Sequence, residues 1–114
     1  MHVFHPPQSV NGLPPENIFY VADSANMTVA DGFLLHTYHP YLFPERPINL
    51  FMSLRSKGPG RDMLLGALLA RAQQLREQTP QFKARLFAQV NPQDTELMAF
   101  YMENGFDAND ALDV

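Results

Sequence analysis

The chain has 114 residues and no cysteine, and 46% of it is hydrophobic against 18% charged. This composition predicts one domain with a core of its own, and it excludes disulfide scaffolds and cysteine zinc sites. A formal net charge of −4 argues against a nucleic-acid partner, so any anion site must be local. No secretory leader pattern and no apolar run of membrane-spanning length occurs, and we expect a cytoplasmic protein without a membrane partner.

The first third of the chain reads as two strands after a proline-rich segment. Residues 1–17 contain four prolines, which prevent a long helix. The β-branched and aromatic run 18–22 predicts a strand, and after turn-forming residues it pairs as a hairpin with a second strand at 28–38. Asp31 and Gly32 inside the second run predict either a bulge or a short second turn.

The middle of the chain changes from strand to helix. Residues 39–47 contain three prolines and predict an extended connector, and the apolar run 48–54 predicts a third, buried strand. Apolar residues at helical spacing predict a helix over residues 61–77. Thr79 and Pro80 stop this helix, and the period-two alternation of residues 84–90 predicts a fourth strand.

A second helix is predicted over residues 92–104. Asn91 is the expected N-cap, Pro92 takes the first helical position, and Asp94 completes a start that is similar to a capping box. Asn104 and the glycine after it form the expected stop. The elements read as strands first, then strand, helix, strand and helix, which predicts an α+β domain.

Three segments follow from these assignments. A proline-rich N-terminal segment covers residues 1–17, the α+β domain covers residues 18–106, and an acidic tail covers residues 107–114. The tail is expected to be poorly ordered, since it is short, acidic and terminal. The whole chain therefore reads as one domain with two flanking segments.

The transition from strand to helix at residues 55–60 is the place best suited to bind an anion. Its glycines let the backbone approach a ligand, and the start of the following helix offers unpaired N–H groups and a positive dipole end. Arg55, Lys57 and Arg61 add positive charge. The residues that define a P-loop or a dinucleotide-binding turn are absent. These residues alone are equally compatible with a phosphate site and with a purely structural turn.

Two motifs at a compatible separation carry a resemblance to a known family. Residues 55–60, Arg-Ser-Lys-Gly-Pro-Gly, fit the pattern Gln/Arg-x-x-Gly-x-Gly/Ala at every position, and the apolar pair Met63 and Leu64 follows as usual. Residues 101–106 fit a second pattern, Tyr-x-x-x-Gly-Phe, at the end of a C-terminal helix. The sequence therefore resembles the GNAT superfamily of N-acetyltransferases over residues 18–106, as a truncated or degenerate member.

The resemblance implies acetyl-CoA as co-substrate and a primary amine of unknown identity as acceptor. It also implies a mixed, splayed sheet in which the cofactor enters between two parallel central strands, at 48–54 and 84–90. The amine would attack the thioester directly. Tyr101 is the implied catalytic acid that protonates the leaving thiolate, while its alternative role is packing. No metal is implied. The implied cofactor-binding residues are Leu54, Arg55, Ser56, Lys57, Gly58, Gly60, Arg61 and Asp94.

Several residues depart from the family pattern. Pro59 lacks the N–H that the residue between the loop glycines usually donates. Asp94 stands where the family usually has an asparagine that contacts the cofactor, and a carboxylate repels phosphate. The strand at 48–54 has no carboxylate to act as base. The substitutes are placed by proximity only, and they are Glu45, His36 and His39.

The largest departure is at the N-terminus, where the proline-rich segment replaces the strand and two helices that open the family fold. Three interpretations stay open: a minimal domain, a subunit completed by a partner in a dimer, and one degenerate part of a tandem acetyltransferase. A sheet edge left bare by the absent strand would pair with another chain. We therefore expect a homodimer or a partner domain that completes the sheet.

Other classes of chemistry have weaker support. The histidine pairs His2/His5 and His36/His39 are unfavourable for metal, because residues three apart on a strand point to opposite faces. No nucleophile elbow and no thiol are present, which removes the common hydrolase mechanisms. Two functions remain as the main expectations. One is an acetyltransferase, and the alternative is a catalytically silent GNAT-like module with a structural, dimerisation or regulatory role. A third, more remote class is a phosphate-binding regulatory domain for a different nucleotide.

Overall fold

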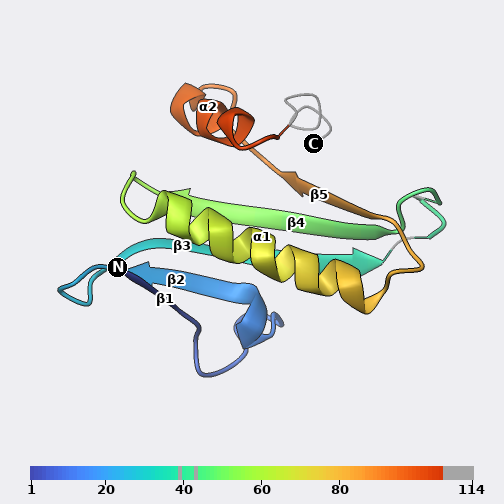
Figure 1. The fold of residues 1–114 in the computed structure, drawn as a ribbon, viewed down its shortest axis with the longest axis horizontal. Helices are drawn as coiled ribbons and strands as arrows, with labels where there is room; N and C mark the ends of the chain where they lie inside the picture. The colour runs from blue at the N-terminus through green and yellow to red at the C-terminus, as the bar shows by residue number, and fades with distance from the viewer. Residues whose placement is uncertain (39, 43, 107–114) are drawn as a thin grey trace.

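The protein forms a five-stranded mixed sheet with one long helix on its face and a short helix beyond its edge (Figure 1). The computed structural model describes residues 1–38, 40–42 and 44–106, so the predicted acidic tail and His39 lie outside the described residues. The predicted α+β class with a mixed sheet is confirmed. The elements are β1 (His2–Phe4), a 3₁₀ turn (Pro15–Asn17), β2 (Ile18–Ala22), β3 (Thr28–Tyr38), β4 (Ile48–Ser56), α1 (Arg61–Gln78), β5 (Ala84–Ala88) and α2 (Thr95–Glu103).

The sheet order is the chain order, β1-β2-β3-β4-β5. The first four strands are antiparallel to their neighbours, and β5 lies parallel to β4 because α1 forms the crossover between them. The pairing of β4 with β5 covers only residues 48–52 of β4. The last four residues of β4 therefore extend past β5 toward the loop that leads into α1.

Most elements follow the predicted periodicity. β2 and β3 have the predicted bounds, and β4 runs two residues further, to Ser56. α1 ends at Gln78, one residue beyond the prediction, and β5 ends at Ala88, two residues before it. The predicted helix stop is confirmed, since Asn104 is the C-cap of α2 and Gly105 has a φ of 92°.

The prediction of a break in β3 is wrong. Asp31 and Gly32 pair in regular register with residues 54–55 of β4. The irregularity in the first hairpin lies instead on the partner strand, between Val21 and Ala22. A glycine inside a strand run can mark a close approach of another element rather than a bulge, and this is the case here.

Gly32 lets α1 lie close to the sheet. A Cβ at this position would clash with the backbone carbonyl oxygen of Ser53. The same Cβ would lie 3.3 Å from a methyl group of Leu68 and 3.4 Å from one of Leu64, both on α1. Because interiors are close-packed, a side chain here would push the helix away from the sheet.

The start of the second helix differs from the prediction. α2 begins at Thr95, and its N-cap is Asp94, whose Oδ1 accepts a hydrogen bond from the Leu97 N–H at 3.1 Å. Asn91 instead stabilises a turn before the helix, where its Oδ1 accepts from the Gln93 N–H at 3.0 Å. Two capping residues compete in this segment, and the one that satisfies a helical N–H donor sets the boundary.

The proline-rich segment contributes a strand that was not predicted. β1 pairs antiparallel with β2 and places Val3 opposite Val21. The β2 edge that was expected to be bare is thus paired over three residues, and the outer edge on this side of the sheet belongs to β1. The outer strands of the sheet are β1 and β5.

The core lies between α1 and one face of the sheet. In the middle of β3 and the second half of β4, buried residues alternate with more exposed ones, as the period of a strand requires. The larger side chains with less than 2% exposure are Leu34, Met52, Leu64, Leu68 and Val21. Among the described residues, no helix is long and apolar enough to cross a membrane.

The close approach at Gly32 predicts a stability change of defined sign. We expect Gly32→Ala to lower the free energy of unfolding by about 1–3 kcal/mol, since the added methyl group overpacks the helix–sheet contact. Gly66→Ala is the matched control, because Gly66 is helical and a Cβ there meets nothing within 4 Å. This control should raise stability by about 0.5–1 kcal/mol. Urea unfolding measures both, and a neutral Gly32→Ala would contradict the packing described.

Candidate phosphate-binding site

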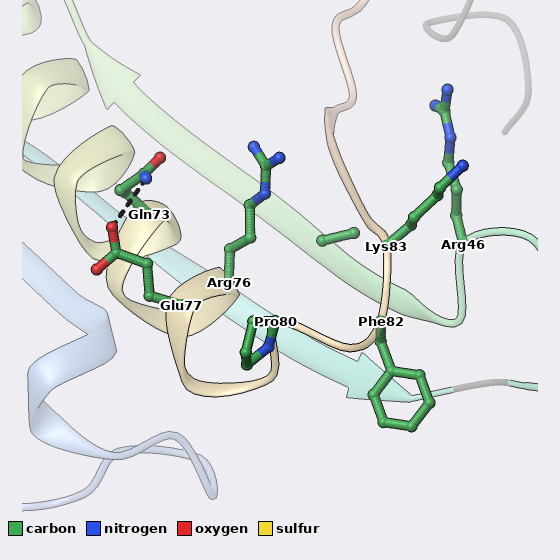
Figure 2. Close-up of a pocket in the computed structure, with 8 residues that line it drawn as sticks. Arg46, Gln73, Arg76, Glu77, Pro80, Phe82 and Lys83 are labelled. Atoms are coloured by element: carbon green, nitrogen blue, oxygen red, sulfur yellow. Dashed lines mark hydrogen bonds between the residues drawn. The ribbon is translucent and has the colours of Figure 1, made fainter.

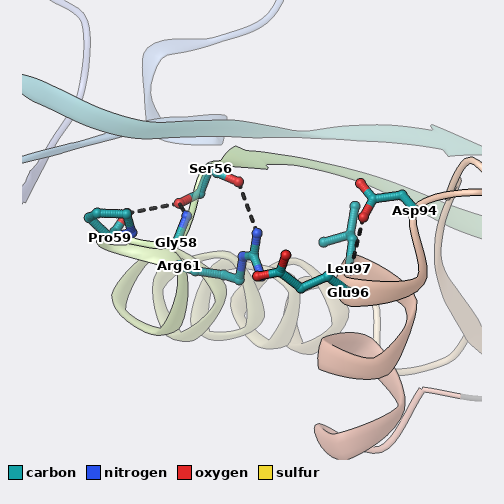
Figure 3. Close-up of polar contacts among 7 residues, drawn as sticks. All are labelled: Ser56, Gly58, Pro59, Arg61, Asp94, Glu96 and Leu97. Carbon is teal, nitrogen blue, oxygen red and sulfur yellow. Dashed lines mark hydrogen bonds and ion pairs between the residues drawn. The ribbon is translucent and has the colours of Figure 1, made fainter.

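The loop between β4 and α1 has a shape that its own residues determine. Gly58 and Gly60 have φ values of 131° and 76°, in the region that favours glycine. A Cβ at Gly60 would also come within 2.9 Å of a methyl group of Val21. The Ser56 hydroxyl accepts from the Gly58 N–H at 3.0 Å and donates to the Pro59 carbonyl at 2.8 Å (Figure 3). The Gly58 N–H is therefore already used within the loop.

The first turn of α1 provides the remaining backbone donors. Gly60 is the N-cap, and no side chain caps this end of the helix. N–H groups at an uncapped helix start favour an anion through their hydrogen bonds and the helix dipole. Asp62 lies exposed in the same turn, and its negative charge competes for this end of the dipole.

A cavity of about 760 Å³ lies beside the loop, between the start of β3, the end of β4 and the start of α2. Six predicted residues line it: Leu54, Arg55, Ser56, Lys57, Arg61 and Asp94. Of the other predicted residues, Gly58 and Gly60 shape the loop without lining the cavity, and Tyr101 is not on its wall. The sequence analysis missed the wall residues Thr28, Val29, Ala30, Asp31 and Leu97.

Arg55 is an exposed cation with a partner across the sheet. Its Nε lies 2.9 Å from Asp31 Oδ1, and the Arg55 side chain is 78% exposed. An ion pair this exposed contributes little to stability, so a phosphate can compete for the guanidinium. Asp31 was missed because its position opposite Arg55 follows from the register of β3 and β4, which the sequence does not specify.

Arg61 connects the loop to α2. The guanidinium Nη2 of Arg61 donates to the Ser56 carbonyl at 3.0 Å, and its Nη1 lies 3.6 Å from Glu96 Oε1 (Figure 3). The guanidinium carbon sits 5.3 Å from the centre of the Phe100 ring. The side chain is only 13% exposed, and its Nε is buried without a hydrogen-bond partner among the described residues. Arg61 thus contacts both the loop, through the Ser56 carbonyl, and α2, through Glu96 and the Phe100 ring.

Tyr101 belongs to the hydrophobic core. It is 4% exposed, and its ring centre lies 5.0 Å from that of Phe106 and 6.0 Å from that of Phe100. Burial raises the pKa of Tyr101 to about 12, although the positive charge of Arg61 lowers it in part. The phenol is therefore fully protonated at neutral pH and is a weak acid.

The substitute bases lie away from the cavity. His36 is five residues further along β3 than Asp31, which is roughly 17 Å at the usual rise of a strand. Glu45 is exposed in the connector before β4, at the same far end of the sheet. Among the described residues, no three His, Cys, Asp or Glu side chains gather in a way that could hold a metal ion.

No family model matches the chain, and no curated protein matches it significantly.

Burial of Tyr101 predicts a loss of stability at high pH. An unfolded tyrosine ionises near pH 10, while the folded one stays neutral to about pH 12. Because the pKa of Tyr101 is higher in the folded state, its contribution to the free energy of unfolding is fully present below pH 10. That free energy then falls by roughly 2–3 kcal/mol as the pH rises from about 10 to 12.

Urea unfolding between pH 8 and 12 measures this loss in the wild type and in Tyr101→Phe. The variant should lack the loss of stability that Tyr101 contributes between pH 10 and 12. Equal pH dependence in the two proteins would contradict the burial of a protonated phenol.

Proposed function

We propose that the chain is an acetyltransferase-like domain that binds acetyl-CoA with the loop between β4 and α1. One observation carries the proposal: a buried strand, a loop with two left-handed glycines and an uncapped helix start meet beside an open cavity of about 760 Å³. This combination is suited to a diphosphate group. The motif at residues 55–60 supports the same ligand through its resemblance to the GNAT superfamily.

The diphosphate would lie against the start of α1, between Arg55 and Lys57. Both cations line the cavity and are exposed, so they can reach a ligand without breaking any contact of the core. Asp31 and Asp94 on the same wall repel phosphate, and the loop offers few N–H donors because Pro59 has none. The charge balance of the wall therefore predicts modest affinity.

The pantetheine would follow the end of β4. The parallel pairing ends at Met52 and Ala88, and beyond this point β4 has no β5 residue beside it. The backbone of Ser53 and Leu54 is thereby unpaired on that side among the described residues, and Leu54 lines the cavity. A strand edge of this kind can hydrogen-bond an extended amide chain.

In the proposed reaction, the nitrogen of a primary amine attacks the carbonyl carbon of the thioester. The C–S bond breaks, the thiolate of CoA takes a proton from the Tyr101 hydroxyl, and the proton that the amine loses passes through water and restores that hydroxyl. A backbone N–H of β4 polarises the carbonyl oxygen. The step requires the Tyr101 hydroxyl within hydrogen-bond reach of the sulfur.

A second function, a catalytically silent module, is favoured by the surroundings of Tyr101. The pKa of about 12 lies well above that of an ordinary thiol, near 8.5, so proton donation to a thiolate is uphill by about 3.5 units. Such a module would bind CoA or a partner without turnover. Its partner would be a second copy or a neighbouring domain that pairs with the outer edge of β5.

Calorimetric titration with CoA and acetyl-CoA tests the site. We expect micromolar binding that weakens at least about tenfold in Arg55→Ala/Lys57→Ala, since each exposed charge-assisted contact contributes about 1.5–3 kcal/mol at most. Asp31→Asn should tighten binding several-fold, because it removes a repelling carboxylate and releases Arg55. Arg85→Gln is the matched control: it removes a cation on β5 that does not line the cavity, and it should leave CoA affinity unchanged. Wild-type affinity in the double variant would exclude this loop as the site.

Acetyl transfer separates the two functions. Release of CoA thiol is measured with a panel of primary amines, for the wild type and for Tyr101→Phe. A catalytic role for Tyr101 predicts that the variant keeps CoA affinity and loses turnover about 100-fold, as expected for removal of a general acid. Equal slow rates in both proteins, with CoA bound, would establish the silent module.

A further inference from the structure

A second cavity, of about 620 Å³, lies at the opposite end of the helix–sheet layer (Figure 2). It is formed where α1 ends, where β5 begins and where the connector enters β4. Three separate segments bring a cation to its wall: Arg46 from the connector, Arg76 from the last turn of α1, and Lys83 from the residue before β5. None of these residues belongs to the loop site.

The positive charge of this cavity is poorly compensated. Glu77 is the carboxylate on the wall, and its Oε1 already accepts a hydrogen bond from the Gln73 side-chain amide at 3.0 Å. Neither ion pair found in the described part of the chain includes Arg46, Arg76 or Lys83. The wall thus carries three cations against one carboxylate, in a chain whose net charge is −4.

The helix dipole accounts for only part of this cluster. Arg76 is in the last turn of α1, where a cation is stabilised by the negative end of the helix. Arg46 and Lys83 lie outside the helix. Their segments are neighbours, since the Ile48 N–H donates a hydrogen bond to the Lys83 carbonyl at 3.4 Å, and Figure 2 shows both side chains extending in the same general direction. Like charges on neighbouring segments repel each other, and a bound anion would relieve that repulsion.

We propose that this cavity binds a small phosphate-bearing anion with at least two negative charges. Two planar guanidinium groups and one ammonium match the oxygens of a phosphate or diphosphate, whereas a single carboxylate would leave most of the charge unbalanced. The volume lies within the range of about 300–1,000 Å³ that is usual for small-molecule sites.

Pro80 and Phe82 form an apolar floor of the cavity. The Phe82 ring packs on Tyr38, with ring centres 5.3 Å apart, and Figure 2 shows it pointing away from the side chains of Arg46, Arg76 and Lys83. The phosphate group is therefore the main feature that the cavity recognises, and the apolar floor is a secondary contact for any organic group attached to it. The site is independent of the loop, so it stands whether or not the loop binds acetyl-CoA.

The test is an amide chemical-shift titration of the folded, ¹⁵N-labelled chain with sodium pyrophosphate, followed by ADP. Resolved shifts separate this cavity, at residues 76 and 83, from the loop at residues 58 and 60. We expect saturable shifts at residues 76 and 83, and affinity that falls at least tenfold in Arg76→Gln/Lys83→Gln. Lys57→Gln, a cation at the other end of the molecule, should leave these shifts unchanged.

Glu77→Gln tests the same charge balance with opposite sign, and it keeps all three cations. Pyrophosphate should bind several-fold more tightly to this variant, because the competing carboxylate is gone. Tighter binding of ADP than of pyrophosphate would show that the apolar floor contributes, and equal binding would show that the phosphate alone is recognised. Both results support the site.

Three results would overturn the proposal. The first is a pyrophosphate response confined to the loop residues, and the second is an unchanged affinity in Arg76→Gln/Lys83→Gln. The third is tighter binding of citrate or of a hexaglutamate peptide than of pyrophosphate and ADP, which would assign the cavity to carboxylates instead.

Discussion

The packing of α1 against the sheet is the interaction on which the rest of the molecule depends. Gly32 provides the close contact, and Leu64 and Leu68 on the helix bury themselves against the strands. Because β4 leads directly into α1, this contact also fixes the loop between them, where Gly60 has no room for a side chain beside Val21. The two cavities lie at opposite ends of this helix–sheet layer, so a shift of α1 would alter both.

α2 depends on residues that the proposed chemistry also needs. Arg61 holds this helix to the loop through the Ser56 carbonyl and Glu96, and Tyr101 anchors it in the core. The low polarity that stabilises the Tyr101 ring raises the pKa of its hydroxyl. Turnover therefore requires α2 to pack differently from the arrangement described, whereas a silent binding module requires no change.

Local patterns were sufficient for most of the fold. The β-branched and aromatic residues of β2 and the helical spacing of apolar residues in α1 are local properties, and they can be read without knowing the partner element. β1 could not be found in this way, because a three-residue strand among prolines forms only through its pairing with β2. The start of α2 was misplaced because Asn91 and Asp94 are both good caps, and only the packed helix decides between them.

For the candidate site, the sequence alone identified the glycine loop, its cations and the helix that follows, because loop and helix start are contiguous in the chain. Tertiary structure decided what those residues do. It paired Arg55 with Asp31 through strand register and buried Tyr101. It also placed the Arg61 guanidinium beside Glu96 and Phe100 of α2. It also assembled the cavity of Arg46, Arg76 and Lys83 from three distant segments. Motif and periodicity are properties of neighbours in sequence, whereas charge compensation and burial depend on neighbours in space.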